Sequence, residues 1–112
     1  MNVIQKKFDF EISNIVDAIV DICNPCKIIL FGSYARGDNN HDSDVDLCIL
    51  IKNLKSQKEV YSQVRREFYK KNLVFSFDLI IQDAEKFERQ VNNPKYIYGI
   101  IEKEGRVIYE HV

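Results

Sequence analysis

Apolar and polar positions along the chain follow two different periods, one typical of helices and one typical of strands. Over residues 9–23, apolar side chains recur every three or four positions, which predicts an amphipathic helix that ends at Asn24-Pro25. Compact apolar runs predict strands over residues 27–31, 44–51 and 73–81. Helices and strands are therefore expected to alternate along this part of the chain.

A capping box marks the start of the helix after the second strand. Ser56 stands three residues before Glu59, and this pattern predicts a helix over residues 56–71. Its buried stripe is expected to consist of Val60, Val64 and Phe68. The expected C-terminal elements are a helix from Asp83, a helix from Asn93-Pro94 to Gly105 with Ile97, Ile100 and Ile101 facing inward, and a strand over residues 107–109.

The composition is that of one globular domain. A chain of 112 residues can bury about two-thirds of its unfolded surface, and 46% hydrophobic and 29% charged residues are ordinary values. No apolar run approaches the roughly 20 residues of a membrane span, and MNVIQKKFDFE lacks the apolar segment of a signal peptide. We therefore expect a single domain over residues 1–112 that is cytoplasmic and has no membrane partner.

The net charge of −1 conceals an uneven distribution of charged residues. Residues 1–51 carry four basic and eight acidic side chains, whereas residues 52–71 carry seven basic and two acidic ones. The basic segment could contact nucleotide phosphates, RNA or an acidic partner surface, or it could be the solvated face of a helix.

Three cysteines in a chain without a secretory signal favour reduced thiols. Cys23 and Cys26 form one C-x-x-C pair after the first helix, and Cys48 lies in the second strand. A lone pair of this kind, without a second pair of ligands, is weak evidence for zinc or redox chemistry.

Residues 27–51 carry the strongest chemical signal in the chain. The first strand ends at Gly32 and Ser33, and after a polar loop the next strand opens with Asp44 and Asp46. Alternate residues of a strand point to the same face, so these two aspartates share a face, about 6.5–7 Å apart at Cα. Because unpaired carboxylates at this spacing repel each other, and because an oxygen-lined site suits magnesium, the pattern points to bound Mg²⁺.

Each part of this signal is weak by itself. Asp-x-Asp is common in loops and strand caps, and metal-dependent nucleases and phosphohydrolases also use clustered aspartates. A P-loop is excluded, because Asp38 and Asn39 follow the Gly32-x4-Gly37 spacing where Lys and Ser or Thr are required. The Gly-Ser turn combined with Asp-x-Asp is much more specific, and a nuclease would not need that turn.

Gly32-Ser33, ten intervening residues and Asp44-x-Asp46 together resemble the nucleotidyltransferases of the DNA polymerase beta superfamily. The longer string GSYARGD…DSDVDL is similar to the minimal nucleotidyltransferases of bacteria and archaea, the small partners of HEPN-domain proteins. The resemblance implies an α+β, polymerase-beta-like fold with a small mixed sheet and helices packed on it. It also implies a third carboxylate from a neighbouring strand, and Asp78 in FDLI matches that position.

The resemblance further implies how the work is divided among these residues. Asp44, Asp46 and Asp78 would be the catalytic residues and the ligands of two Mg²⁺ ions. Gly32 and Ser33 would hold the triphosphate of ATP, the substrate.

Three positions near the turn leave alternatives open. Arg36 could contact the triphosphate together with the Gly-Ser pair, or it could brace the loop through Asp38 or Asp42. Tyr34 could stack on a base or pack on the first helix. Ser33 could cap the short helical turn that follows it.

The implied reaction is Mg²⁺-dependent transfer of AMP from ATP to an acceptor hydroxyl, with release of pyrophosphate. The implied partner is a HEPN-domain toxin in a hetero-oligomer, which is modified on a tyrosine and thereby neutralised by this antitoxin. The alternatives are an antitoxin that neutralises its partner by binding alone, and nucleotidyl transfer to a small molecule or RNA. Beyond that last alternative, direct nucleic-acid binding is not expected.

Overall fold

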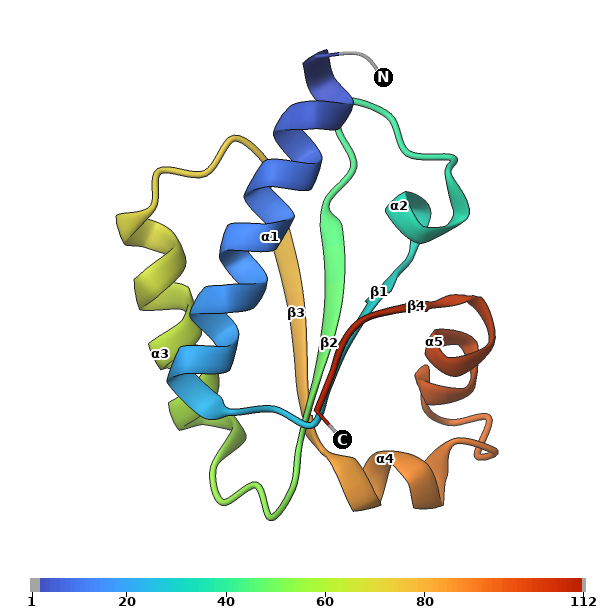
Figure 1. The fold of residues 1–112 in the computed structure, drawn as a ribbon. Coiled ribbons are helices and arrows are strands. Elements are labelled where there is room, and N and C mark those ends of the chain that lie inside the picture. Colours follow the sequence, from blue (N-terminus) through green and yellow to red (C-terminus); the bar gives the residue numbers. More distant parts are fainter. Residues whose placement is uncertain (1–2, 112) are drawn as a thin grey trace.

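The computed structural model describes residues 3–111, and this part of the chain forms five helices around a four-stranded sheet (Figure 1). Residues 1–2 and 112 of the expected domain lie outside the described residues. The elements in chain order are α1 (Val3–Cys23), β1 (Lys27–Phe31), α2 (Ser33–Arg36), β2 (Val45–Ile51), α3 (Gln57–Lys70), β3 (Phe77–Asp83), α4 (Ala84–Gln90), α5 (Tyr98–Glu104) and β4 (Arg106–Glu110).

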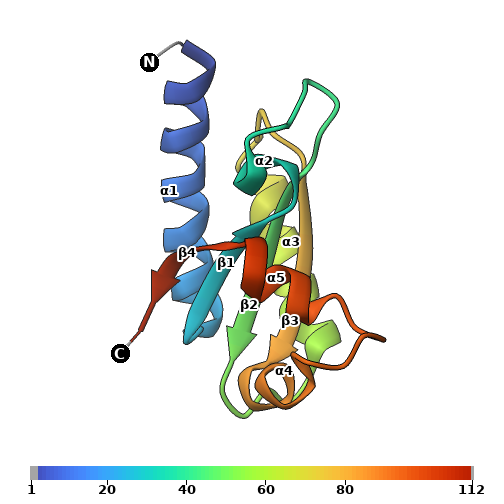
Figure 2. The ribbon, with the colours of Figure 1, turned by 90° about the vertical axis from the view of Figure 1, so that its right-hand side faces the viewer.

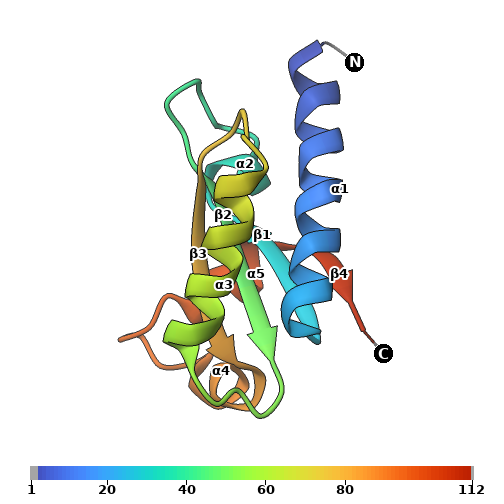
Figure 3. The ribbon, with the colours of Figure 1, turned by 90° about the vertical axis from the view of Figure 1, so that its left-hand side faces the viewer.

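The sheet is mixed and has the strand order β3-β2-β1-β4. β1 pairs antiparallel with β2 and β4, whereas β2 pairs parallel with β3. Helices α1 and α3 cover one face of the sheet, and α4 and α5 lie on the other (Figures 1, 2 and 3). The expected α+β fold with a small mixed sheet is confirmed. In the described part of the chain, every helix is too short or too polar to cross a bilayer.

Alternate residues of β2 belong to two separate cores. Leu47 and Ile49 face α1 and α3, whereas Cys48 and Leu50 pack with Phe87 of α4 on the opposite face. A central strand buried on both faces needs apolar residues at nearly every position, and β2 has them from Leu47 to its end. Asp46, the second residue of the strand, is therefore the exception.

The Ser56 half of the predicted capping box of α3 is present. The Ser56 hydroxyl accepts a hydrogen bond from the Glu59 amide (3.1 Å), which satisfies one of the free N–H groups at the helix start. Val64 and Phe68 are buried, and Val60 is partly buried against the same core. The predicted inner stripe is confirmed.

The boundaries of two predicted elements change. α1 begins at Val3 rather than near residue 9, since its first turns contain neither proline nor glycine. β3 begins at Phe77 rather than at residue 73. The amides of Val74 and Phe75 donate to the two carboxylate oxygens of Glu11 in α1 (2.7 and 2.9 Å), so these two residues are held by a helix side chain.

The inward face predicted for the last helix is wrong at two positions. Ile97 and Ile100 are 44% and 55% exposed, whereas Tyr98 and Ile101 are buried. The reason is the helix start: α5 begins at Tyr98, after a series of turns, so its rotation differs from that of a helix starting at Asn93-Pro94. The ring of Tyr98 packs against another aromatic ring in α4, that of Phe87, with centroids 4.9 Å apart.

Asp83 ties the end of β3 to two other segments. Its carboxylate accepts from the amide of Leu54 (3.0 Å) and, as the N-cap of α4, from the amide of Lys86 (3.1 Å). These hydrogen bonds, first that of Leu54 and then that of Lys86, lower the pKa of Asp83 below its ordinary value.

We expect Asp83→Ala to lower the melting temperature by a few degrees at neutral pH. A lowered pKa means that the charged carboxylate stabilises the folded state above its ordinary pKa of 3.8. This contribution is lost as the pH falls through the folded value. Thermal melts over a pH series should therefore show the difference between wild type and Asp83→Ala shrinking in acid.

The matched control is Asp83→Asn, which keeps an oxygen acceptor but cannot titrate. The difference in melting temperature between Asp83→Asn and Asp83→Ala should not change with pH. If the difference between wild type and Asp83→Ala is equally independent of pH, the charge of Asp83 does not contribute in this way.

Candidate active site

Two of the three predicted carboxylates lie side by side at one end of the sheet. Asp46 in β2 is the register partner of Asp78 in β3, so both side chains leave the same face, on strands about 4.8 Å apart. Further along this face, Cys48 and Ile80 are covered by α4 and α5. Asp78 is exposed and Asp46 is partly buried, so the pair lies where that cover ends.

Asp44 is the third predicted carboxylate, and it precedes β2 by one residue instead of opening it. The pKa of Asp46 is raised, first by its burial and then by the negative charges of Asp78 and Asp44, while Arg36 opposes the shift. The three acids are therefore close enough to interact. Within residues 3–111, no three acidic, histidine or cysteine side chains already converge on one metal position.

A hard divalent cation fits this set of donors. Carboxylate oxygens at an open edge leave coordination positions for water and phosphate, which is the arrangement that Mg²⁺ prefers. The pKa of Asp46 is raised first by burial and then by the charges of Asp78 and Asp44, and Arg36 lowers it without reversing the shift. The donor chemistry therefore suits Mg²⁺, and the magnesium site stays a prediction.

Gly32 meets two constraints that no other residue type satisfies together. Its φ of 72° lies in the left-handed region. A Cβ atom at this position would collide with the carboxylate of Asp46. The backbone of the turn and the Asp46 side chain thus occupy adjoining space, and only glycine allows both.

Ser33 is the first residue of α2, and the cap predicted for its side chain does not form. The N-cap is Gly32, and it caps the helix without a side-chain hydrogen bond. The Ser33 carbonyl accepts from the amides of Gly37 (2.8 Å) and Asp38 (3.1 Å), which closes the turn through the backbone. Among the described residues the Ser33 hydroxyl has no hydrogen-bond partner, so it remains available to a ligand.

Arg36 braces the loop through Asp38, one of the two alternatives considered for it. Its Nε donates to the Asp38 carboxylate at 3.1 Å. The pKa of Arg36 is raised chiefly by this hydrogen bond and by the charge of Asp38, with smaller contributions from Glu104 and Asp46. Arg36 therefore lies near the carboxylate site and balances part of its charge.

Three aromatic rings, from α1, the turn and the segment before β3, pack together behind the turn. The ring of Tyr34 stacks on Phe8 of α1 (centroids 5.0 Å apart, 6° between planes), and both rings meet the ring of Phe75 edge-on. Tyr34 thus packs on the first helix, as one of the two alternatives proposed. Because Phe75 also donates its amide to Glu11, α1 holds both the turn and the segment that leads to Asp78.

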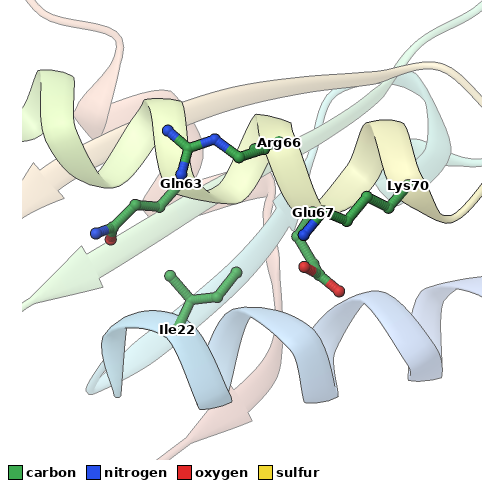
Figure 4. A pocket seen from close by; sticks show the side chains of 5 residues that line it. All are labelled: Ile22, Gln63, Arg66, Glu67 and Lys70. Carbon is green, nitrogen blue, oxygen red and sulfur yellow. The ribbon is translucent and has the colours of Figure 1, made fainter.

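The basic segment lies away from the carboxylates. α3 packs on the sheet face opposite to that of Asp46, and Arg65 donates to the Phe77 carbonyl at 2.6 Å. A hollow of about 300 Å³ between α1 and α3 is also remote from the carboxylates; Figure 4 shows its lining residues, Ile22, Gln63, Arg66, Glu67 and Lys70. The basic helix therefore does not line the acidic site.

Two of the three cysteines are poorly suited to metal or redox chemistry. Cys23, Cys26 and Cys48 are free thiols. Burial raises the pKa of Cys23 to about 11 and that of Cys48 to about 12. These two side chains are therefore protonated at neutral pH, whereas metal binding and thiol exchange require the thiolate.

We expect Gly32→Ala to lower the free energy of unfolding by about 1–3 kcal/mol through backbone strain and also to weaken Mg²⁺-nucleotide binding by displacing Asp46. Gly37→Ala is the matched control, because Gly37 has a φ of 84° but open space around its would-be Cβ. Urea denaturation and calorimetric titration should show loss of stability in both variants but loss of binding in Gly32→Ala alone. Equal effects on binding would contradict the role of the Asp46 contact.

Asp46→Asn should raise the melting temperature in a chelating buffer by about 2–4 °C, because it removes a partly buried charge that faces two others. Added Mg²⁺ should stabilise the wild type by mass action but not this variant. Asp42→Asn, the same change at an exposed loop position, should leave both responses unchanged. A melting temperature that falls in Asp46→Asn would contradict repulsion at the site.

Three proteins with related sequences share the same description. Three proteins of Methanocaldococcus jannaschii are named "Putative protein adenylyltransferase". One is 37% identical over 83 residues, which are 74% of this chain and 77% of that protein. Another is 46% identical over 54 residues, 48% of this chain and 50% of that protein, and the third is 39% identical over 62 residues, 50% and 42%. This chain thus matches half or less of the length of those two relatives.

Two crystal structures share the fold. A "putative nucleotidyltransferase from Sulfolobus solfataricus" superposes with a TM-score of 0.60 at 21% identity, over 88% of this chain and 76% of that one. A toxin-antitoxin protein solved with AMP-PNP gives 0.55 at 16% identity, over 88% and 73%. The family model of the nucleotidyltransferase domain matches residues 11–108, and this chain belongs to that family.

Proposed function

We propose that this chain transfers a nucleoside monophosphate from a nucleoside triphosphate, ATP, to an acceptor hydroxyl. The observation that carries the proposal is the placement of Asp46 beside Asp78 on one open sheet face, with Asp46 against Gly32. Membership of the nucleotidyltransferase domain family supports the same reaction. Such transfer depends mainly on positioning and on neutralising charge.

Each residue of the site has a separate role in the proposed transfer. The hydroxyl of Ser33, at the turn made by Gly32, would hold the triphosphate. Asp78 is the exposed member of the registered pair, so it would meet the incoming hydroxyl and accept its proton as the new bond to the α-phosphorus forms and pyrophosphate leaves. Two Mg²⁺ ions held by Asp44, Asp46 and Asp78 would neutralise charge on the phosphates.

Arg36 is the proposed third contact to the triphosphate. Its guanidinium group is paired with Asp38 and lies near Asp46. An arginine with a fixed fork of donors suits phosphate oxygens. The pairing with Asp38 would orient the side chain while leaving other donors free.

The proposed acceptor is a protein hydroxyl, that of a tyrosine in a HEPN-domain toxin, with this chain acting as the antitoxin. The relatives named as protein adenylyltransferases support a protein acceptor. A toxin-antitoxin protein with the same fold, solved with AMP-PNP, supports the assignment of partner and nucleotide. The exposure of Asp78 at an open edge suits a large acceptor.

The test is label transfer from α-labelled ATP to a HEPN-domain protein co-expressed with this chain, in Mg²⁺. We expect one AMP ester on a tyrosine, no transfer of γ-label, and at least about a hundredfold loss of rate in Asp44→Ala with Asp46→Ala. Asp42→Ala is the matched control and should remain active.

The other outcomes separate the alternatives. Neutralisation of the toxin by the double variant would favour an antitoxin that acts by contact alone. Label on RNA or on a small molecule would show that the acceptor is not a protein. Cleavage of RNA by this chain alone would favour a nuclease.

A further inference from the structure

The outer side of α1 carries an exposed stripe that the proposed function does not use. Its members recur alternately every four and every three residues, which is the spacing of a seam between two packed helices. Two of them are large apolar side chains, Val3 at 67% and Phe10 at 73% exposure. The stripe consists of Val3, Lys7, Phe10, Asn14, Asp17 and Asp21, all of them exposed.

A preformed groove runs beside the middle of this stripe. It has a volume of about 380 Å³ and lies between α1 and the segment that follows α3. Val74, 70% exposed, contributes to its apolar wall. Because Glu11 binds the amides of Val74 and Phe75, the groove is held open by fixed contacts. Its lining residues are Lys7, Phe10, Glu11, Asn14, Lys71, Asn72, Leu73 and Val74.

Charge is distributed along the stripe with opposite signs at its two ends. Lys7, next to Lys6, lies toward the start of α1, and Asp17 and Asp21 lie toward its end. Within the described part of the chain, none of these four side chains forms an ion pair. The stripe is therefore complementary to a copy of itself that runs in the opposite direction.

We propose that two copies of this chain pair through antiparallel α1 helices. In this register Lys7 of each copy faces Asp17 of the other, and Phe10 of each copy lies opposite Asn14 and enters the groove beside it. Each contact occurs twice, as a two-fold axis requires. A bulky aromatic side chain in a fixed apolar groove, rimmed by opposite charges, is the usual anatomy of such an interface.

The charges favour a second copy of this chain, in antiparallel orientation, over other partners. A parallel pair of helices would set lysine against lysine, and an anionic membrane would meet the aspartates of the same stripe. The carboxylate site also stays free, because α1 covers the sheet face opposite to that of Asp46 and Asp78. Two paired copies would thus present two accessible sites, whatever reaction those sites perform.

The test is sedimentation velocity over a wide range of concentration. We expect a dimer for the wild type, and dissociation constants raised about tenfold or more for Phe10→Ser, Asp17→Lys and Lys7→Asp. A mixture of Asp17→Lys with Lys7→Asp should form heterodimers, because both cross-pairs then join unlike charges. All three positions are exposed, so circular dichroism should show unchanged folding.

Asp9→Lys is the matched control: Asp9 is exposed on the same helix, roughly 100° around it from Phe10, and its reversal should leave the dimer intact. A wild type that is monomeric at every concentration would overturn the proposal. It would equally be overturned if Asp9→Lys and Asp17→Lys weakened the dimer alike, or if the mixed variants failed to pair.

Discussion

The structure depends on one electrostatic constraint: two carboxylates stand at the same level on neighbouring parallel strands, at one end of a sheet whose central strands are largely apolar. The alternation that buries Leu47 on the α1 side necessarily turns Asp46 to the other side. Asp78 lies next to Asp46 because the parallel register of β2 and β3 pairs these two positions. Such a pair is tolerable only where the face is open to water and ions. On β2 and β3 the cover formed by α4 and α5 therefore has to stop short of the pair, and there it reaches Cys48 and Ile80.

Glycine at the Gly-Ser turn follows from the same constraint. The carboxylate of Asp46 occupies the space that a Cβ atom at position 32 would need, so the turn and the acid are fitted to each other. The turn is then closed by its own backbone, through the Ser33 carbonyl. Within residues 3–111, this leaves the Ser33 hydroxyl without a hydrogen-bond partner. A close backbone approach and a free donor are what a site for a phosphorylated substrate requires.

Local signals predicted much of this arrangement, and long-range contacts account for what they missed. β1 was predicted with its observed bounds, and strand parity correctly placed Asp46 on the face opposite to that of Leu47. The shared face predicted for Asp44 and Asp46 stays a prediction, because Asp44 lies one residue before β2. The later start of β3 depends on Glu11, which lies more than sixty positions away in sequence. The position of Asp78 depends on the parallel register of β3, which periodicity does not encode; family resemblance supplied it.

The two helical layers give the sheet faces different tasks. α4 and α5 bury the part of one sheet face that contains Cys48 and Ile80, next to Asp46 and Asp78. α1 supports the site from the opposite face through Phe8 and Glu11. These side chains hold Tyr34, next to the turn, and the segment before β3. A displacement of α1 would also move Tyr34 and Phe75, because Phe8 and Glu11 join the helix directly to these two residues. A rigid α1 is therefore a condition for keeping the carboxylates and the turn in register.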